Sequence, residues 1–473
     1  MAKTYITTAI PYVNGAPHVG HTLDYLQADT YARYCKLCGD EVRFQAGTDE
    51  HGNKIFQKAI EADQNIKEYI GDNAKKFQDF IHSLEAEYTD FIRTTDDDHK
   101  KRCQAIWKKL SPHIYQDTYE GWYCDGCERF VTDKEYDENT GTCPDHQTPY
   151  KKLSEANYYL KISDFKSRIK AAIETNEMQI LPEFRKREIL KLLEDTPDVS
   201  ISRPKKNLSW GIPVPDDDSQ VMYVWMDALT NYITILGYPD KDISDWWPAT
   251  AQFVGKDILR FHAIIWPTIL LGLDLPLPRA IVSHGHVLVD GQKMSKTIGN
   301  VVDPLEVIER HGIAACRYYF LRHVDTFSDA DFTWDKFESA YNDELADDLG
   351  NLVQRLATLS SKNQITPPDF TPTFDDEYVQ FMDSFHFSKA FDYVWGKIQD
   401  VNRRIDETKP WSLAKSGDRE QLKKVMQSLI ADLLQASYLL QPFLPFISTR
   451  ITEIFTSEKI VPPKKPLFPK NET

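Results

Sequence analysis

The first fifty residues of the chain alternate between strand-like and helix-like patterns. Residues 4–8 are rich in β-branched side chains and end in a turn of Pro, Asn and Gly. Apolar residues at helical spacing follow from about 19 to 37, and residues 41–46 have the pattern of a second strand. Two strands bridged by a helix predict a parallel β-α-β unit, which places the chain in the α/β class.

This alternation is interrupted and later ends. Between about 115 and 220 it gives way to turn residues, a cysteine cluster and charged helical stretches, and strands are predicted again at 251–254 and 280–284. Only amphipathic helices, such as 420–440, are expected beyond about 343. We therefore predict a Rossmann-type parallel-sheet domain that is split by an insertion and followed by an α-helical bundle. The predicted parts are 1–114 (first half of the sheet domain), 115–220 (insertion), 221–290 (second half), 291–343 (connecting region) and 344–473 (helical domain with an extended tail).

Composition and charge narrow the class of protein. No apolar run approaches the roughly 20 residues that span a bilayer, so we expect a cytoplasmic protein without a membrane partner. The chain has 56 basic and 72 acidic residues, and a net charge of −16 by itself disfavours a nucleic-acid partner. Basic runs at 185–187, 203–206 and 464–470 leave that question open, because binding requires only a local basic surface.

A His-x-Gly-His motif follows the first predicted strand. Its residues are His18, Gly20 and His21, at the start of the first predicted helix. Ligands of parallel sheets bind at the carboxyl ends of the strands, and a helix N-terminus offers free N–H groups to phosphate. The imidazoles can donate hydrogen bonds to a phosphate group, and Gly20 allows its close approach. The motif predicts a nucleotide site, although two ordinary polar histidines would give the same pattern.

A second motif lies in the later half of the chain. Lys293-Met-Ser295-Lys296-Thr297 follows a strand-like stretch and a turn at Asp290-Gly291. Two lysines three positions apart, with Ser295 between them, can surround a departing pyrophosphate as point charges. The alternative is a solvated basic turn, which the presence of the His-x-Gly-His motif disfavours.

Four potential metal ligands lie in the predicted insertion. Cys124 and Cys127 form a Cys-x2-Cys pair, and Cys143 and His146 follow as Cys-x2-His after fifteen residues. Two knuckles of this kind supply four N and S ligands to a tetrahedral zinc ion, and a complete protein shell makes such a zinc structural. A further Cys-x2-Cys pair, in the first predicted helix, has no second pair to complete a site.

The two phosphate motifs together resemble the signature of class I aminoacyl-tRNA synthetases, and the sequences around them resemble the methionyl-tRNA synthetase family. The segments that carry the resemblance are 9–21 (AIPYVNGAPHVGH), 47–52 (GTDEHG), 223–232 (YVWMDALTNY), 255–262 (GKDILRFH) and 265–267 (IWP). It extends over nearly the whole chain and implies an enzyme that activates methionine with ATP and Mg²⁺ and esterifies it to tRNA(Met). Two positions depart from the family pattern: Thr297 replaces a usual serine, and Leu229 stands where many relatives have proline.

The resemblance implies functional residues at the matching positions. The catalytic residues are His18, His21, Lys293 and Lys296, and the further ATP-binding residues are Gly20, Lys256, Asp257 and Ser295. The methionine-binding residues are Ile10, Tyr12, Asp49, Trp225, Ala228, Leu229, Tyr232, Phe261, His262 and Trp266. The chemistry agrees, because a buried carboxylate such as Asp49 needs a cation, here the substrate ammonium group, and aromatic surface suits a thioether. Core packing would also explain the aromatic spacing, and a helix N-cap would explain Asp49.

The predicted helical domain carries a second set of implied contacts. Asn351 and Arg355 lie four residues apart on one helix face, and Pro410 and Trp411 end a later helical region. The resemblance implies that these four residues read the CAU anticodon, with Trp411 stacked on an unpaired base. Packing between helices is the alternative interpretation. The resemblance also gives the zinc of the insertion a counterpart in the family.

Other protein classes would share parts of this pattern. Leucyl, isoleucyl and valyl enzymes carry a much larger editing insertion, and a cysteinyl enzyme would place its zinc ligands around the amino-acid site. A nucleotidyltransferase or an amino-acid ligase would not need Asn351, Arg355 and Trp411. A non-catalytic zinc-ribbon RNA-binding protein would not need an intact Lys-Met-Ser-Lys loop. The resemblance includes no appended C-terminal dimerisation domain, so we expect a monomer.

Overall fold

Six strands form one parallel sheet at the centre of the α/β body. The computed structural model describes residues 2–124, 126, 129–289, 291–293 and 302–470. The strand order is β3-β2-β1-β12-β13-β7, and every neighbouring pair is parallel. The strands are β3 (Asp90–Arg93), β2 (Glu41–Thr48), β1 (Lys3–Thr8), β12 (Ala251–Gly255), β13 (Ala280–His284) and β7 (Gln179–Leu181). The predicted Rossmann-type parallel sheet is confirmed.

The order of the strands defines where a ligand can bind. β2 and β3 follow β1 on one side of it, whereas β12 and β13 lie on its other side. The crevice at the carboxyl ends of β1 and β12 is therefore the switch point of the sheet, which is where open α/β sheets bind their ligands. The His-x-Gly-His motif follows β1, and Lys256 and Asp257 follow β12, so the two motifs meet at this point.

Helices cover both faces of the sheet, and neighbouring strand residues enter different cores. Ile6 and Phe253 belong to the core under α1 (Thr22–Leu37), whereas Tyr5 and Val254 belong to the core under α8 (Val224–Thr234). The other helices and helical turns of the body are η1 (Val19–His21), α2 (Asn53–Glu61), α3 (Ile66–Ser83), α4 (Asp97–Lys109), η2 (Ser111–His113), α5 (Asp133–Glu138), α6 (Lys166–Glu174), α7 (Glu183–Asp195), η3 (Phe261–Ile265) and α9 (Trp266–Gly272).

The segment predicted as an insertion contributes two antiparallel sheets and one strand of the central sheet. One sheet has the order β5-β4-β6-β8 and the other β10-β11-β9. Their strands are β4 (Ile114–Cys124), β5 (Arg129–Val131), β6 (Lys151–Leu160), β8 (Val199–Ser200), β9 (Ser202–Pro204), β10 (Pro213–Val214) and β11 (Asp217–Met222). β7 instead pairs in parallel with β13, so the chain re-enters the central sheet inside the predicted insertion and leaves it again.

A small sheet joins the body to the helices that follow. It has the order β15-β14-β16, with strands β14 (Val287–Val289), β15 (Gln292–Lys293) and β16 (Ala330–Phe332). The helices of this connecting region are α10 (Pro304–His311), α11 (Ile313–Tyr318), η4 (Tyr319–His323), α12 (Trp334–Ser339) and η5 (Ala340–Gly350). Because β14 follows β13 almost directly, β15 is held close to the carboxyl edge of the central sheet.

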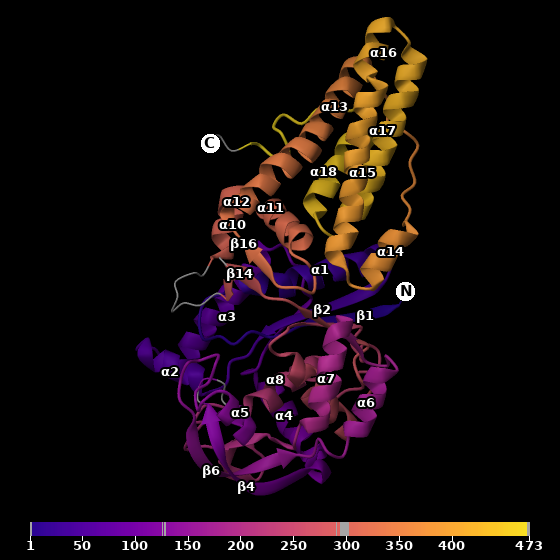
Figure 1. The fold of residues 1–473 in the computed structure, drawn as a ribbon. Coiled ribbons are helices and arrows are strands. Elements are labelled where there is room, and N and C mark those ends of the chain that lie inside the picture. The colour runs from indigo at the N-terminus through magenta and orange to yellow at the C-terminus, as the bar shows by residue number, and fades with distance from the viewer. Residues whose placement is uncertain (1, 125, 127–128, 290, 294–301, 471–473) are drawn as a thin grey trace.

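A bundle of helices forms the upper part of the molecule in Figure 1, above the α/β body. Its helices are α13 (Asn351–Asn363), α14 (Asp376–Asp383), α15 (Phe387–Thr408), α16 (Pro410–Ser416), α17 (Arg419–Leu440) and α18 (Pro445–Thr456). The helical bundle prediction is confirmed, and the predicted helix 420–440 matches α17 closely. No helix in the described part of the chain is long and apolar enough to cross a membrane.

The core under α1 continues from the sheet into the bundle. Phe253 of β12 and Phe387 of α15 have ring centroids 6.1 Å apart, and both side chains are buried. Arg317 lies fully buried at the same junction, where its guanidinium pairs with Asp29 at 2.8 Å and donates to the carbonyl of Phe443 at 2.7 Å. A buried arginine is tolerated only when its donors are satisfied, so this contact fixes α1 against the bundle.

Candidate functional site

The His-x-Gly-His residues are held in one geometry by backbone hydrogen bonds. His18 caps η1, and its Nδ1 accepts the N–H of Gly20 at 3.1 Å. The Nδ1 of His21 accepts the N–H of His18 at 3.1 Å, and the two rings lie 4.0 Å apart. When Nδ1 accepts in this way, the proton of a neutral imidazole is on Nε2, which can donate to a phosphate oxygen.

Burial and the neighbouring His18 ring lower the pKa of His21 to about 3. His21 is therefore neutral near pH 7, and it stabilises charge as a hydrogen-bond donor rather than as a cation.

The pKa of His284, at the end of β13, is shifted in the opposite direction. Burial alone would lower its pKa, but Asp24, 2.9 Å from its Nε2, outweighs burial and raises it. His284 and Asp24 thus form a hydrogen-bonded pair beside the switch point that sequence patterns did not reveal.

Lys256 and Asp257 lie at the carboxyl end of β12, as the resemblance implies, but each has a protein partner. The ammonium of Lys256 contacts both carboxylate oxygens of Asp329, at 2.7 and 2.6 Å. Asp257 lies 3.4 Å from the Nε2 of His286. Asp329 also accepts the backbone N–H of His286 at 2.9 Å, so it ties the end of β12 to the start of the β14 strand. In this geometry Lys256 is engaged in that ion pair.

Lys293 lies on β15, and its backbone pairs with Leu288 of β14. Ser295, Lys296 and Thr297 lie outside the described residues. The chain resumes at Val302, whose carbonyl accepts the N–H of Val19 at 3.2 Å. The described chain that follows the second motif is therefore in contact with the first motif.

Aromatic side chains from α8 and η3 form one cluster beside the sheet. The rings of Trp225 and Phe261 stack at 3.8 Å and 9°, and the hydroxyl of Tyr232 lies 2.7 Å from the Nε2 of His262. The other ring nitrogen of His262 lies 3.1 Å from the carbonyl of Ile258, so Nδ1 donates there and Nε2 accepts from Tyr232. Burial lowers the pKa of His262 to about 4, which keeps this arrangement neutral.

The loop after β2 brings Asp49 next to the segment that carries Ile10 and Tyr12. Tyr12 and Asp49 form an isolated parallel bridge, and the N–H of Asp49 donates to the carbonyl of Pro11 at 2.9 Å. Ile10 lies close to Gly47, where an added Cβ would approach its side chain to 3.0 Å. Only 6% of Asp49 is exposed, so its carboxylate is mostly withdrawn from water at a strand end.

Some implied methionine-binding residues serve mainly as support for that cluster. Trp266 is fully buried and its indole N–H donates to Gln252 at 3.0 Å. Its ring lies 5.7 Å from that of Tyr232. Ala228 and Leu229 on α8 are also buried, at 5% and 1% exposure. The replacement of a family proline by Leu229 is thus accommodated inside an unbroken helix.

The predicted metal ligands come together as far as the structure describes them. The ligand atoms of Cys124, Cys143 and His146 all lie within 4.8 Å of one another, whereas Cys127 lies outside the described residues. The sulfur of Cys143 is 3.6 Å from the Nδ1 of His146. A Cβ at Gly126 would lie 2.3 Å from the imidazole, so the glycine allows this knuckle to close on His146.

A polar groove on the bundle collects the residues of the second implied set. It has a volume of about 720 Å³, and its lining includes Asn351, Arg355 and Trp411. Arg355 bonds to Asp406 and Asn402, both at 3.1 Å. Pro410 is buried and begins α16, so it fixes the turn that presents Trp411. Within the described chain the side-chain Oε1 of Gln354 and the Nε of Arg355 are buried and have no hydrogen-bond partner.

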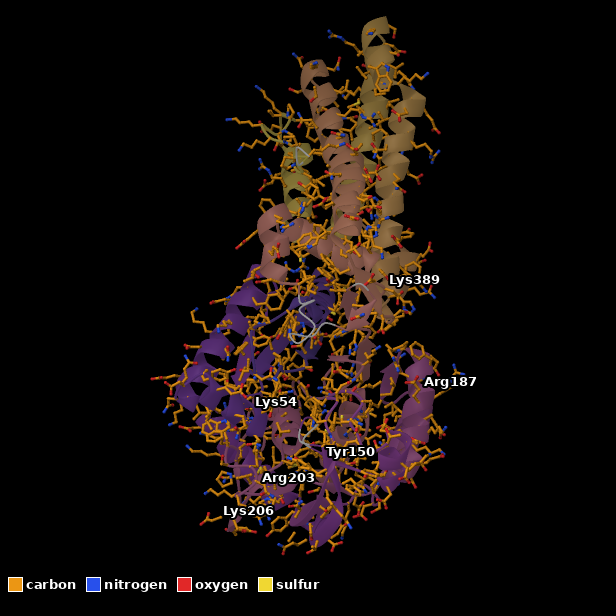
Figure 2. All side chains as sticks on the ribbon, turned by 60° about the vertical axis from the view of Figure 1, so that its left-hand side comes forward. Lys54, Tyr150, Arg187, Arg203, Lys206 and Lys389 are labelled. Atoms are coloured by element: carbon orange, nitrogen blue, oxygen red, sulfur yellow. The ribbon has the colours of Figure 1, made fainter. Side chains whose placement is uncertain are left out.

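The basic runs at 185–187 and 203–206 lie on different parts of the molecule. Arg203 is buried, and its guanidinium lies 4.3 Å from the ring centroid of Tyr223. Figure 2 shows Arg187 and Lys389 on one side of the molecule, and Lys206 on the other side near the lower end of the body. Charge alone therefore does not define a nucleic-acid surface, and the groove on the bundle is the better candidate.

Comparison with known proteins gives a consistent result. The family model described as tRNA synthetases class I (M) matches residues 4–152 and 145–357. The methionine–tRNA ligase of Thermotoga maritima is 36% identical over 470 residues, which is 95% of this chain and 74% of that protein. The methionine–tRNA ligase of Clostridium tetani is 41% identical over 471 residues, which is 95% of this chain and 73% of that protein.

The chain belongs to the methionyl-tRNA synthetase family of class I. The Mycobacterium tuberculosis methionyl-tRNA synthetase in complex with methionyl-adenylate superposes with a TM-score of 0.91 at 33% identity, covering 99% of this chain and 100% of that chain. The free-state structure of the same enzyme superposes with a TM-score of 0.86 at 30% identity, covering 100% of this chain and 99% of that chain. The resemblance inferred from the motifs is thereby confirmed over nearly the full sequence.

One connection in this family member was not visible in the sequence. Asp227 of α8 is fully buried and bonds to two histidines, His51 after β2 and His99 of α4. The available signal was a single carboxylate within an otherwise apolar helical stretch, which by itself does not identify a partner. The structure shows that this carboxylate links elements on both sides of the aromatic cluster.

Proposed function

We propose that this family member is a methionine–tRNA ligase that forms methionyl-adenylate from methionine and ATP and transfers methionine to the 3′ end of tRNA(Met). The single observation that carries the proposal is the meeting of the aromatic cluster, Asp49 and the His18–His21 motif at one end of the central sheet. Asp49 binds the substrate ammonium group. The stacked Trp225 and Phe261, with Tyr232 and His262, hold the thioether end.

In the first step a carboxylate oxygen of methionine bonds to the α-phosphorus of ATP. The bond from that phosphorus to the bridging oxygen breaks, and pyrophosphate leaves. His18 and His21 donate to the phosphate oxygens as charge develops, and Lys293 and Lys296 neutralise the leaving group. Mg²⁺ enters as part of the ATP substrate and screens its phosphate charge. In the second step a ribose hydroxyl of the terminal adenosine attacks the carbonyl carbon, and AMP leaves.

ATP is held by the same end of the sheet. Gly20 allows the nucleotide to approach the backbone of η1, and Ser295 accompanies the two lysines of the second motif. Asp257 lies beside His286 at the carboxyl end of β12, close to the switch point. Lys256 binds the nucleotide only if it exchanges the Asp329 carboxylate for a ligand phosphate, because its ammonium is paired in this geometry.

The insertion holds a structural zinc ion. A tetrahedral zinc with bonds of roughly 2.3 Å to sulfur and 2.1 Å to nitrogen separates the two ligand atoms by about 3.6 Å. The Cys143 sulfur and the His146 nitrogen have this separation, 3.6 Å, and the buried Cys124 completes a third corner. Cys127 is the fourth ligand. Metal analysis should give one zinc per chain, and Cys127→Ser should lower that content while leaving methionine-dependent pyrophosphate exchange measurable.

The groove on the bundle reads the anticodon. Trp411 stacks on an unpaired base, while Asn351 and Arg355 bond to base edges. Asp347 and Asp406 also line the groove, where they pair with Lys470 at 2.7 Å and Arg355 at 3.1 Å.

Amino-acid-dependent ATP–pyrophosphate exchange across the twenty amino acids tests the function. Exchange with methionine alone, without tRNA, supports the proposal and the assignment of the aromatic cluster together. Exchange with another amino acid would retain the class I chemistry and overturn the assignment of the pocket. Exchange with none, in a zinc-loaded and folded protein, would favour a non-catalytic RNA-binding role.

A further inference from the structure

The carboxylate of Asp227 bonds to two imidazoles that come from distant parts of the chain. Its Oδ2 lies 2.6 Å from the Nδ1 of His51, and its Oδ1 lies 2.7 Å from the Nε2 of His99. The second nitrogen of His99 lies 2.7 Å from the hydroxyl of Thr234 on the same helix as Asp227. All these side chains are nearly fully buried. We refer to His51, Asp227 and His99 as the Asp227 network.

Electrostatics favour the charged form of this carboxylate. Burial alone would raise the pKa of Asp227, but the contacts with His51 and His99 outweigh burial and lower it. A buried carboxylate with two charge-assisted hydrogen bonds is costly to leave with only one of them. The network is therefore a strong constraint on the relative position of the three elements that supply it.

The network joins the two halves of the proposed methionine site. His51 lies two residues after Asp49, in a loop that Trp210 also fixes by donating to the carbonyl of Glu50 at 2.7 Å. Asp227 lies two residues after Trp225 in α8, which carries the aromatic half. One carboxylate thus connects the loop that binds the ammonium group to the helix that binds the thioether.

A metal site is the alternative interpretation of part of this cluster. The ligand atoms of His99, Cys103 and Asp227 lie within 4.8 Å of one another. However, two ligands of one tetrahedral zinc with bonds of roughly 2.0–2.2 Å are about 3.4 Å apart. The 2.7 Å between His99 and Asp227 is the length of a charge-assisted hydrogen bond. The cluster therefore fits a hydrogen-bonded network and not a metal centre.

We propose that the Asp227 network sets the distance between the ammonium site and the thioether pocket, and thereby determines affinity for methionine. The inference rests on the proposed methionine-activating function and adds a role for residues that do not touch the substrate. Asp227 and His99 act as positioning residues. Because ATP is bound at the His18–His21 end of the site, affinity for ATP is independent of the network.

Asp227→Asn is the first test, because the amide keeps the size of the side chain and loses one acceptor and the charge. We expect KM for methionine to rise about 10- to 100-fold in pyrophosphate exchange, as one charge-assisted hydrogen bond is lost. KM for ATP should stay within about two-fold, since the phosphate motif is untouched. Calorimetric titration of methionine onto the protein without ATP should show the same loss in Kd.

Two substitutions of His99 separate a positioning role from a general packing role. His99 also borders a surface cavity of about 360 Å³, so water can occupy space that a smaller side chain vacates. His99→Leu removes the donor to Asp227 and should raise KM for methionine about 3- to 10-fold. His99→Gln keeps an N–H close to the Nε2 position and should restore KM to within about two-fold of the parent. The matched control is His82→Leu, an exposed histidine remote from the network.

The outcomes are distinct. The proposal is supported if His99→Leu raises KM for methionine and His99→Gln leaves KM close to that of the parent. Two results would overturn it in favour of simple packing. One is a fall in kcat together with equal rises in KM for methionine and for ATP, and the other is the same KM for methionine in His99→Leu and His99→Gln. Should Asp227→Asn fail to fold by circular dichroism, the His99 pair decides alone. A parent protein that shows neither exchange nor binding with methionine refutes the proposed function and the network's role with it. A parent that is active beside unaffected variants refutes only the network.

Discussion

The proposed methionine site and the proposed anticodon groove on the bundle use similar side chains in different states of pairing. At the methionine end, aromatic and polar groups are already bonded to one another: Tyr232 to His262, and Asp227 to two histidines. In the groove, Arg355 is held by an exposed aspartate, and its Nε has no partner within the described chain. Tyr232, His262 and Asp227 of the first site, which we call the closed site, are paired within the protein, whereas the groove opens to the surface.

The difference agrees with the sizes of the two proposed ligands. A small amino acid presents few atoms, so selectivity requires side chains that are fixed before it binds and that exclude water. An RNA loop supplies many groups of its own and can satisfy donors that the protein leaves open. Substitutions at the closed site should therefore affect small-substrate kinetics, whereas substitutions in the groove should affect only steps that involve tRNA.

Asp49→Asn should have the largest effect. It removes the only negative charge assigned to the substrate ammonium group, a loss of about 3–4 kcal/mol for a buried charge pair. We expect kcat/KM for methionine in pyrophosphate exchange to fall about 100- to 1000-fold, with the circular dichroism spectrum unchanged. A loss below about three-fold would show that the ammonium group binds elsewhere.

Trp411→Ala should weaken tRNA binding at the groove and leave methionine activation at the closed site unchanged. Loss of one base–aromatic stack costs about 1–3 kcal/mol, so KM for tRNA(Met) in aminoacylation should rise about 10- to 100-fold. Methionine-dependent pyrophosphate exchange without tRNA should not change. Trp225→Ala, at the other site, should give the reverse pattern, and equal effects of both variants on exchange would contradict the division.

His262 should make the closed site sensitive to acid. Its folded pKa of about 4 lies below the ordinary 6.5, so below pH 6.5 the unfolded chain binds a proton that the folded chain refuses. Stability from this residue is full above pH 6.5 and is lost as pH falls toward 4, by about 1 kcal/mol between pH 6 and pH 5. Urea unfolding should show a flatter pH dependence in His262→Gln. His82→Gln, an exposed control, should keep the parent slope.

Tyr232→Phe should have the smallest effect. It removes one buried neutral hydrogen bond, to His262, which is worth about 1 kcal/mol. We expect KM for methionine to rise about five-fold and KM for ATP to stay constant. A change in ATP kinetics of the same size would mean that the aromatic cluster and the phosphate site are not separate.

Much of the architecture was predictable because local patterns decide it. The strands at 251–254 and 280–284 and the helix 420–440 were expected within one or two residues of β12, β13 and α17. β7 was not foreseen, because three residues between charged helices carry no periodic signal. Its pairing with β13, a hundred residues later, is a property of the tertiary fold.

The candidate site was predictable in its residues but not in its connections. The motifs identify Asp49 and Trp225, and the structure adds that Asp227 ties their elements together. Arg203 belongs to a basic run that the sequence offers as a possible binding surface. In the structure its guanidinium is buried and lies over the ring of Tyr223. Sequence patterns report which side chains have useful chemistry, and burial decides which of them remain available.

Helix α15 connects the two regions as a spacer of fixed length. Its first residue, Phe387, packs against Phe253 of the central sheet, and its last lies two positions before Pro410. Its 22 residues correspond to about 33 Å at 1.5 Å per residue. Lengthening the helix by one turn would move Trp411 by about 5.4 Å relative to the active site. The length of α15 therefore fixes the distance between the groove and the central sheet.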